Sequence, residues 1–564
     1  MKQLKIILAL AALSAVPVLC AKTMVLFTSG NDSLRNLSSL DSIKFSGASG
    51  SRNFIMHRGT GNTVTALSTI DSIRFYDGAA VFTPEMLYNG ATASPMILGT
   101  GKAFITLDLR NFTSGFSGEM STDPIDCLDK DNAGVSALAV LSNATVATRT
   151  VIPAGAAVTL YYKTGNNYFN ETGWTAWTVA PGLNCNLTGL SGRYLKLRYT
   201  MTTASKSALP QIAQAAVYAN YSSLPQFVKT VTASSFVNER IVTGAYPFGW
   251  ESRTTAAIQN FTTGAGLAAV VAAKTSEFDK IYALTDWCAR KARGSTPSSP
   301  YPWDITRVYG SGTIYGHCMS YAEVLITGLT GLGWYARHWA IQEYTPGNRN
   351  HEVVEVWCNA LKKWVYQDPS LDTYYANPTT GQPLSILEMH DINMTNGAIT
   401  NVDGKYHYGV YTDPYNWQTL QGYKTTGYMM MTTRNNFHSQ PSPAYSEFGN
   451  GVCGYNTFPS YIDSRTLTCD NTMTKFSGRQ RDFWYTLNQA SIKAKQSSEN
   501  QLTLEFGNSQ PFFKQYMVSV DGGAFAAATS PYVWTLHSGS NRLVVAPEDN
   551  WATRGLQSEI QVSY

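Results

Sequence analysis

Hydrophobic and polar residues alternate along much of the chain, in short runs separated by Gly, Asn and Thr. Alternation with a period of two is clearest in three runs, at 103–109, 157–163 and 193–199. It predicts half-buried strands at the spacing of a β-sandwich, which we place at 79–222. Further β runs predict a second sandwich at 481–564, with strands at 483–485, 501–506, 516–520, 532–536 and 543–545.

A different periodicity marks residues 223–440. Helical stretches are predicted at 254–261, 266–273, 277–292 and 384–391. A further helix is predicted directly after Cys318, because Ala322, Leu325, Ile326 and Leu329 recur at spacings of three and four and Gly331 marks its end. Two strands follow at 351–357 and 361–368, with Asn359-Ala360 as a short turn between them. This part of the chain is therefore predicted to be an α+β unit.

The segment 22–78 contains an internal repeat, because Leu37–Phe45 is echoed thirty residues later by Leu67–Phe75. Two copies are too few for a solenoid, so each is interpreted as a strand pair with a structural or tethering role. The predicted order is a signal peptide 1–21, short β repeats 22–78, a jelly-roll-like β-sandwich 79–222, the α+β unit 223–440, a loop-rich connector 441–480 and an Ig-like sandwich 481–564.

The first 21 residues have the features of a secretory signal. Lys2 and Lys5 precede an apolar run at 6–13, which is too short to span a bilayer, and no later stretch is long enough either. We expect cleavage after Ala21 and a secreted or cell-surface protein of bacterial type. Lipid modification of Cys20 is the alternative, against which the bulky Leu19 argues.

Charge excludes some classes of partner. Only 14% of the residues are charged and the formal net charge is +4. Removal of the two signal lysines leaves 40 basic and 38 acidic residues. Nothing in this balance indicates nucleic acid or an anionic membrane surface as a partner.

The chain has eight cysteines, of which seven remain after removal of the signal. An odd number in a secreted protein leaves one thiol unpaired, and Cys318 is the natural candidate. Grouping by position predicts three disulfides, Cys127–Cys185, Cys288–Cys358 and Cys453–Cys469.

Cys318 is the candidate nucleophile. It lies in the first turn of its predicted helix, where the helix dipole favours thiolate over thiol. If Cys358 pairs with Leu361 across the short turn, His351 stands opposite Asp368 on one face of the hairpin, and a turn longer by one or two residues would still leave the two near each other. A base and an orienting carboxylate are what a thiol nucleophile needs.

These motifs resemble the transglutaminase-like superfamily. The resemblance rests on Gly316-x-Cys318-x-x-Tyr321-Ala322 opening a helix, on Gly331 to Arg337, on His351 in one strand and on Asp368-Pro369 ending the next. It covers roughly residues 225–430 and implies a papain-like catalytic core with Cys318 as nucleophile, His351 as base and Asp368 as orienting carboxylate. Glu352 departs from the family pattern, in which an aromatic residue or an apolar pair often follows the histidine.

The resemblance implies acyl transfer through a thioester on a protein or peptide substrate. Bacterial relatives are often hydrolases, so we expect a peptidase or amidase, with glutamine crosslinking as the alternative. The backbone N–H of Cys318 and the side chain of His317 or Trp303 are candidate oxyanion donors.

Two readings of other classes remain open. One is a secreted adhesion or glycan-binding protein with a degenerate core, in which Trp174 and Trp177 stack on a surface polysaccharide; both rings also suit the core or rim of the sandwich. The other is a zinc site made of the three candidate residues, which no metal-binding spacing supports. No cofactor or metal is therefore expected.

Overall fold

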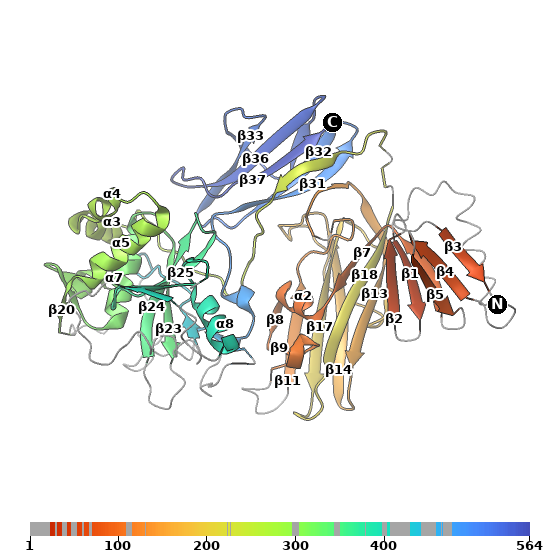
Figure 1. Cartoon of the computed structure of the whole chain (residues 1–564), viewed down its shortest axis with the longest axis horizontal. Coiled ribbons are helices and arrows are strands. Elements are labelled where there is room, and N and C mark those ends of the chain that lie inside the picture. Colours follow the sequence, from red (N-terminus) through yellow and green to blue (C-terminus); the bar gives the residue numbers. More distant parts are fainter. Residues whose placement is uncertain are drawn as a thin grey trace.

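The computed structural model describes residues 23–28, 31–36, 42–46, 53–58, 61–66, 70–108, 116–129, 131–222, 224, 225, 227–295, 304–342, 350–377, 379–396, 403–406, 429–440, 458–463, 465 and 476–564. The signal peptide, the predicted disulfide Cys453–Cys469 and most of the connector 441–480 lie outside these residues. Strands dominate the described chain, and its longer helices gather between 256 and 396 (Figure 1).

Strands of one repeat copy pair with strands of the other. The first copy forms β1 (Thr23–Thr28), β2 (Asn31–Asn36) and β3 (Ser42–Ser46), and the second forms β4 (Asn53–Arg58), β5 (Gly61–Ala66) and β6 (Ile70–Tyr76). Within each copy the first two strands pair, but β3 pairs with β4 and β6 returns to β1. Each copy therefore supplies an edge to the other.

Two antiparallel sheets form the sandwich that follows. One has the order β16-β13-β18-β10-β9, with β7 also on β18, and the other has the order β15-β14-β17-β11-β8. Alternate residues of the long strands fill the core between them, as the period of two predicts. The bounds are β7 Gly78–Phe82, α2 Pro84–Asn89, β8 Ala91–Ser94, β9 Met96–Leu98, β10 Ile105–Leu107, β11 Phe116–Thr122, β13 Val140–Val151, β14 Ala156–Gly165, β15 Thr178–Val179, β16 Cys185–Thr188, β17 Tyr194–Thr203 and β18 Gln211–Ser222.

A six-stranded sheet of order β25-β24-β23-β28-β29-β30 lies at the centre of the next unit. Helix α7 packs on one face with α3 and α5, and α8 shares the core on the other face. The bounds are α3 Ala256–Gly264, α4 Leu267–Ala272, α5 Glu277–Ala289, β20 Ala292–Gly294, α6 Ile305–Val308, β21 Tyr309–Gly310, β22 Thr313–Tyr315, α7 Cys318–Gly331, β23 Ala336–Gln342, β24 Asn350–Cys358, β25 Lys363–Gln367, β26 Thr373–Ala376, α8 Ile386–Asn396, β27 Asp403–Tyr406, β28 Met429–Met431, β29 Ser460–Tyr461 and β30 Phe476–Ser477.

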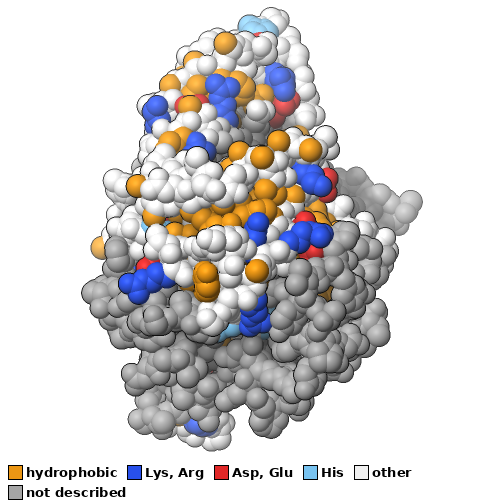
Figure 2. Space-filling model, turned by 90° about the vertical axis from the view of Figure 1, so that its left-hand side faces the viewer, with side chains coloured by type: hydrophobic (Ala, Val, Ile, Leu, Met, Phe, Trp, Pro, Cys, Tyr) orange, Lys and Arg blue, Asp and Glu red, His pale blue; other side chains and the backbone are white. Residues whose placement is uncertain are grey.

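Figure 2 looks onto the side of the molecule that lies at the left in Figure 1. Hydrophobic side chains gather in a band across the middle of this face, with Lys and Arg side chains around it. Helices α4 and α5 border a hollow of about 480 Å³, whose lining includes Val270, Tyr282 and Trp287.

The C-terminal sandwich takes strands from distant parts of the chain. Its sheets have the orders β12-β31-β32-β35 and β19-β37-β36-β33-β34. Strand β12 (Val135–Ala137) pairs in parallel with β31, and β19 (Thr232–Val237) pairs with β37. The other bounds are β31 Ala490–Ser498, β32 Gln501–Asn508, β33 Phe513–Val520, β34 Ala526–Ala528, β35 Tyr532–Thr535, β36 Ser540–Asp549 and β37 Ser558–Ser563.

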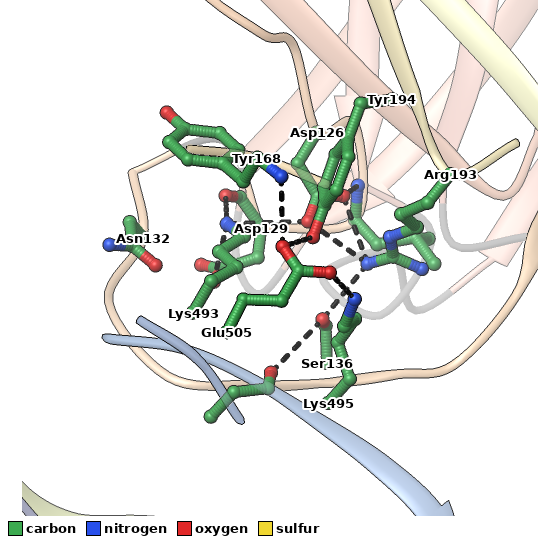
Figure 3. Close-up of polar contacts among 12 residues, drawn as sticks. Asp126, Asp129, Asn132, Ser136, Tyr168, Arg193, Tyr194, Lys493, Lys495 and Glu505 are labelled. Atoms are coloured by element: carbon green, nitrogen blue, oxygen red, sulfur yellow. Dashed lines mark hydrogen bonds and ion pairs between the residues drawn. The ribbon is translucent and has the colours of Figure 1, made fainter. Parts of the chain in front are cut away.

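A buried network of charges joins the two sandwiches where β12 enters (Figure 3). Asp126 pairs with Arg193 at 2.9 Å and with Lys493 at 3.2 Å, and Lys493 also reaches Asp129 at 3.0 Å. Burial acts to raise the pKa of Asp126, but Arg193 and Lys493 lower it overall. Both cations are nearly or fully buried, so each depends on its carboxylate partners.

A second pair completes this junction network. Lys495 on β31 contacts Glu505 on β32, and both side chains are buried. Glu505 also accepts a hydrogen bond from the Tyr194 hydroxyl at 3.1 Å and from the backbone N–H of Tyr168 at 2.9 Å. Residues from both sandwiches therefore satisfy the same carboxylate.

Three details of the prediction are wrong. The first error concerns the disulfides Cys127–Cys185 and Cys288–Cys358, because all four cysteines are free thiols. The Cys127 thiol faces the carbonyl oxygen of Val217, and the Cys358 thiol faces Glu277 at 3.6 Å. The segment 483–485 is not a strand, because its aromatic residues pack into the core of the central sheet.

The third error is the hairpin turn. Strand β24 ends at Cys358 and β25 begins at Lys363, which is the residue that Cys358 pairs with. The loop therefore has four residues, and Lys362 closes it with a φ of 52° and an N–H that donates to the carbonyl of Asn359.

None of the described helices is long and apolar enough to cross a membrane.

Candidate active site

Cys318 is the first residue of α7. Gly316 precedes it with a φ of 122°, a backbone conformation that favours glycine, and His317 caps the helix in extended conformation. The Arg293 Nε–H donates to the Gly316 carbonyl at 3.2 Å and so holds this turn. The apolar residues of α7 anchor the helix in the core, which leaves the sulfur at the positive end of the helix dipole.

The environment of Cys318 favours the thiolate. Burial acts to raise the pKa of this thiol, but hydrogen bonds with His317 and His351 outweigh burial and lower the pKa to about 6. The Sγ atom lies 3.9 Å from His317 Nδ1. Cys127, Cys288 and Cys358 differ, because burial raises the pKa of each of these thiols far above that of Cys318.

His351 and Asp368 meet across the hairpin, although the register differs from the prediction. Val354 pairs with Gln367, so His351 lies diagonal to Asp368 and not opposite to it. Diagonal neighbours remain within reach of long or aromatic side chains. His351 Nε2 lies 2.6 Å from Asp368 Oδ2.

Asp368 is held from several sides. Its Oδ1 accepts from the backbone N–H groups of Ser370 at 2.9 Å and Leu371 at 3.2 Å, and its Oδ2 also accepts from the Tyr366 hydroxyl at 3.3 Å. The carboxylate is fully buried and fixes the imidazole orientation. Burial acts to lower the pKa of His351, but Asp368 and the contact with Cys318 raise it to about 9.

The three predicted residues therefore come together in one site. Because His351 Nε2 faces Asp368, Nδ1 is the ring nitrogen left for the thiol. A thiol pKa of about 6 beside an imidazole pKa of about 9 makes thiolate and imidazolium the favoured pair between these values. Trp303 lies outside the described residues, and the described residues contain no cluster of three His, Cys, Asp or Glu side chains arranged to hold a metal ion.

A second group of ionisable residues lies near the site, and of these only Glu352 stood out in the sequence. His338 on β23 lies 2.5 Å from Glu352 on β24, and Glu323 of α7 lies near both; all three are buried. The sequence carries a partial signal, because the neighbours of these two strand residues on the same face of the strands include Ala336, Ala340 and Val354. The partner of each of the two could not be read from the sequence.

Trp174 and Trp177 lie on the outer side of the first sandwich. Trp174 donates a hydrogen bond to the carbonyl of Asn167 and packs against Gly165. The Trp177 ring has Lys163 at 4.7 Å and Arg198 at 4.8 Å from its centroid. Both rings are half-buried, so they contribute to the rim of the sandwich.

Comparison with known proteins agrees with the family resemblance. Residues 265–369, from the start of the α4 region to the end of the β24–β25 hairpin, match the family model of the transglutaminase-like superfamily. The chain therefore contains a transglutaminase-like domain, and members of that superfamily are cysteine peptidases or acyltransferases. None of the curated proteins matches the chain.

Solved structures with detectable similarity include two candidate proteases and one transglutaminase. A candidate cysteine protease from Cytophaga hutchinsonii has 14% identity over 50% of this chain and 78% of its own, with a TM-score of 0.17. A candidate protease from Parabacteroides distasonis has 9% identity over 45% and 63%, with a TM-score of 0.15. Red sea bream transglutaminase has 11% identity over 80% of each chain and a TM-score of 0.19. TM-scores this low carry no argument about fold or activity.

Proposed function

We propose that the chain is a cysteine-dependent acyl-transfer enzyme that hydrolyses peptide or amide bonds on a papain-like α+β core. Cys318 is the nucleophile, His351 the base and acid, and Asp368 the orienting carboxylate. The observation that carries the proposal is the approach of a buried His351–Asp368 pair, 2.6 Å apart, to a thiol at a helix N-terminus.

In the first half of the reaction, the Cys318 thiolate attacks the carbonyl carbon of an amide and a C–S bond forms. The oxyanion accepts hydrogen bonds from the Cys318 backbone N–H and from the His317 side chain. The His351 imidazolium then donates its proton to the amide nitrogen, the C–N bond breaks, and an amine leaves a thioester behind.

In the second half, neutral His351 takes a proton from water while the water oxygen attacks the thioester. The C–S bond breaks, a carboxylic acid leaves, and the sulfur returns as a thiolate beside the imidazolium. Asp368 keeps the imidazole oriented and stabilises its positive charge throughout. A lysine amine in place of water would give an isopeptide crosslink, which is the alternative outcome.

A mixed peptide pool tests the proposal. Wild type and Cys318→Ala are incubated with the pool, with and without a primary amine, and the masses of the products are measured by mass spectrometry. Hydrolysis gives cleaved or deamidated peptides in the wild-type reaction alone. Amine incorporation would replace the hydrolytic assignment by crosslinking. Equal products from both proteins would overturn the role of Cys318.

The pH dependence gives a second test. The thiolate is lost as the pH falls through about 6 and the imidazolium is lost as it rises through about 9. We expect kcat/KM to follow a bell between these values. Activity that rises steadily to pH 10 would contradict an ion-pair nucleophile.

We also propose that the enzyme is secreted or displayed at the cell surface and acts on proteins there. The sequence of residues 1–21 supports this placement. Binding of a surface polysaccharide through the first sandwich is a further proposal, which the substitution Trp177→Ala tests.

A further inference from the structure

The described chain contains a buried carboxylate–imidazole pair that the proposed reaction does not use. His338 Nε2 lies 2.5 Å from Glu352 Oε2, and the two side chains are each 3% exposed. Burying two charges costs free energy unless they balance each other. A pair of this kind within electrostatic reach of Cys318 therefore needs a reason.

The strand register explains why the pair faces the nucleophile helix. Ala340 pairs with Glu352, so His338 and Glu352 are diagonal neighbours on one face of β23 and β24. This is the face on which α7 packs, since Val354 and Val356 share a core with the apolar residues of α7. The pair thus lies under the helix that begins with Cys318.

We propose that His338 and Glu352 are positioning residues whose opposed charges set how readily Cys318 loses its proton. This proposal rests on the proposed function, because it assigns these residues to the reactivity of the same sulfur. Neither residue touches the reacting atoms, so their action is electrostatic.

The charges act on the sulfur with opposite signs. The Glu352 carboxylate opposes the negative thiolate and raises the pKa of Cys318. His338 interacts favourably with the thiolate. Burial alone would lower the pKa of His338, but Glu352, Glu323 and Cys318 raise it overall, which favours the cationic imidazolium. The pair therefore exerts two influences of opposite sign on one sulfur.

Other ionisable groups act on the same sulfur from the elements packed around it. His317 comes from the helix cap and His351 from β24, and both lower the pKa of Cys318. Arg293 on β20 acts on His317. Glu323 of α7 faces the pair; burial and Glu352 raise the pKa of its carboxyl to about 7, so its charge appears as the solution becomes alkaline.

Alkylation of Cys318 by iodoacetamide as a function of pH tests the inference on the full chain. The peptide that carries Cys318 is quantified by mass spectrometry, so the other thiols do not interfere. Glu352→Gln removes the opposing charge and should move the alkylation midpoint to lower pH by about one unit. His338→Gln removes the favourable cation and should move the midpoint to higher pH by a similar amount.

The opposite signs separate an electrostatic role from a merely structural one. Loosened packing would change both variants in the same direction, whereas the double variant should return near the wild-type midpoint. His390→Gln is the matched control, because His390 of α8 is a buried imidazole 3.3 Å from Asp463 in the core on the other face of the sheet. Its midpoint should not move.

Three outcomes decide the matter. Shifts in the same direction, or no shift in either single variant while wild-type Cys318 reacts well below pH 8, would overturn the inference and leave the proposed function intact. An unreactive wild-type Cys318 would overturn both. If Glu352→Gln does not fold, Glu352→Asp withdraws the charge by one methylene and should give a smaller shift in the same direction as Glu352→Gln.

Discussion

Two of the buried groups of charged side chains in the described part of the chain are built on different principles. In the junction network, each buried cation meets a carboxylate, and tyrosine and backbone donors complete the contacts. Around Cys318, carboxyl and imidazole groups interact with one sulfur, and the pKa values of Cys318, Glu323 and His351 lie between about 6 and 9.

The difference separates charges that hold parts together from charges that change during a reaction. In the junction network, Asp126 is held ionised, because its pKa lies below the ordinary value. The pKa values of Cys318, Glu323 and His351 lie near neutrality, as the proposed nucleophile and base require. Groups whose pKa values are shifted to near neutrality therefore mark the proposed reactive site better than the stably ionised network does.

Asp368→Asn should have the largest effect on the reactive group. It removes the charge that stabilises the His351 imidazolium and leaves an amide of the same shape, so kcat/KM should fall by about 10³- to 10⁴-fold. Tyr366→Phe, which removes only one hydrogen bond to Asp368, is the milder control. Activity within tenfold of wild type would show that Asp368 does not orient the base.

Glu505→Gln should have the largest effect on the junction network. It leaves Lys495 buried without its countercharge, so the free energy of unfolding should fall by about 3–5 kcal/mol in urea titrations. Alkylation of Cys318 in the folded protein should not change. A loss below about 1 kcal/mol would mean that water or another carboxylate replaces Glu505.

Glu323→Gln should show that the buried Glu323 carboxylate lowers the stability of the folded protein. The pKa of Glu323 in the folded protein is about 7, above its ordinary value of 4.5, so the folded state binds this proton more tightly. The resulting penalty is absent at low pH and complete above pH 7, where it amounts to about 3 kcal/mol. Glu323→Gln should therefore stabilise the protein at pH 8 and not at pH 4, by urea unfolding at both values. Equal effects at both pH values would contradict this assignment.

Trp177→Ala should have the smallest effect. The ring contributes cation–π contacts worth about 1 kcal/mol each at exposed sites, so the free energy of unfolding should fall only slightly. Peptide hydrolysis should be unchanged. Retention of the protein on an insoluble polysaccharide, lost in Trp177→Ala and kept in Val179→Ala, would support the glycan proposal, and equal retention of both variants would remove it.

Much of the site could be predicted because it depends on local signals. The helix after Cys318 follows from the spacing of its apolar residues, and α7 begins and ends as expected. The approach of His351 to Asp368 follows from a hairpin, and it survives a change of two residues in the register because diagonal neighbours also meet. Local periodicity therefore carries a large part of the candidate site.

What the sequence could not predict depends on contacts between distant segments. The disulfide pairing failed because spacing along the chain does not say where a thiol points, and the Cys358 thiol turns to Glu277. Glu352 could be noticed, but its partner His338 is chosen by the pairing of β23 with β24. The insertion of β12 into a sheet that is formed by residues more than 350 positions later leaves no local trace.

That insertion has a consequence for how the protein is made. Strands β12 and β19 leave the ribosome long before β31 and β37 exist, so each waits with open backbone groups for neighbours that come last. Edges of this kind readily join the wrong partner. A nascent chain stalled before residue 490 therefore exposes two unpaired edge strands. A chaperone that binds the polypeptide during synthesis would have to keep these strands from pairing with other chains.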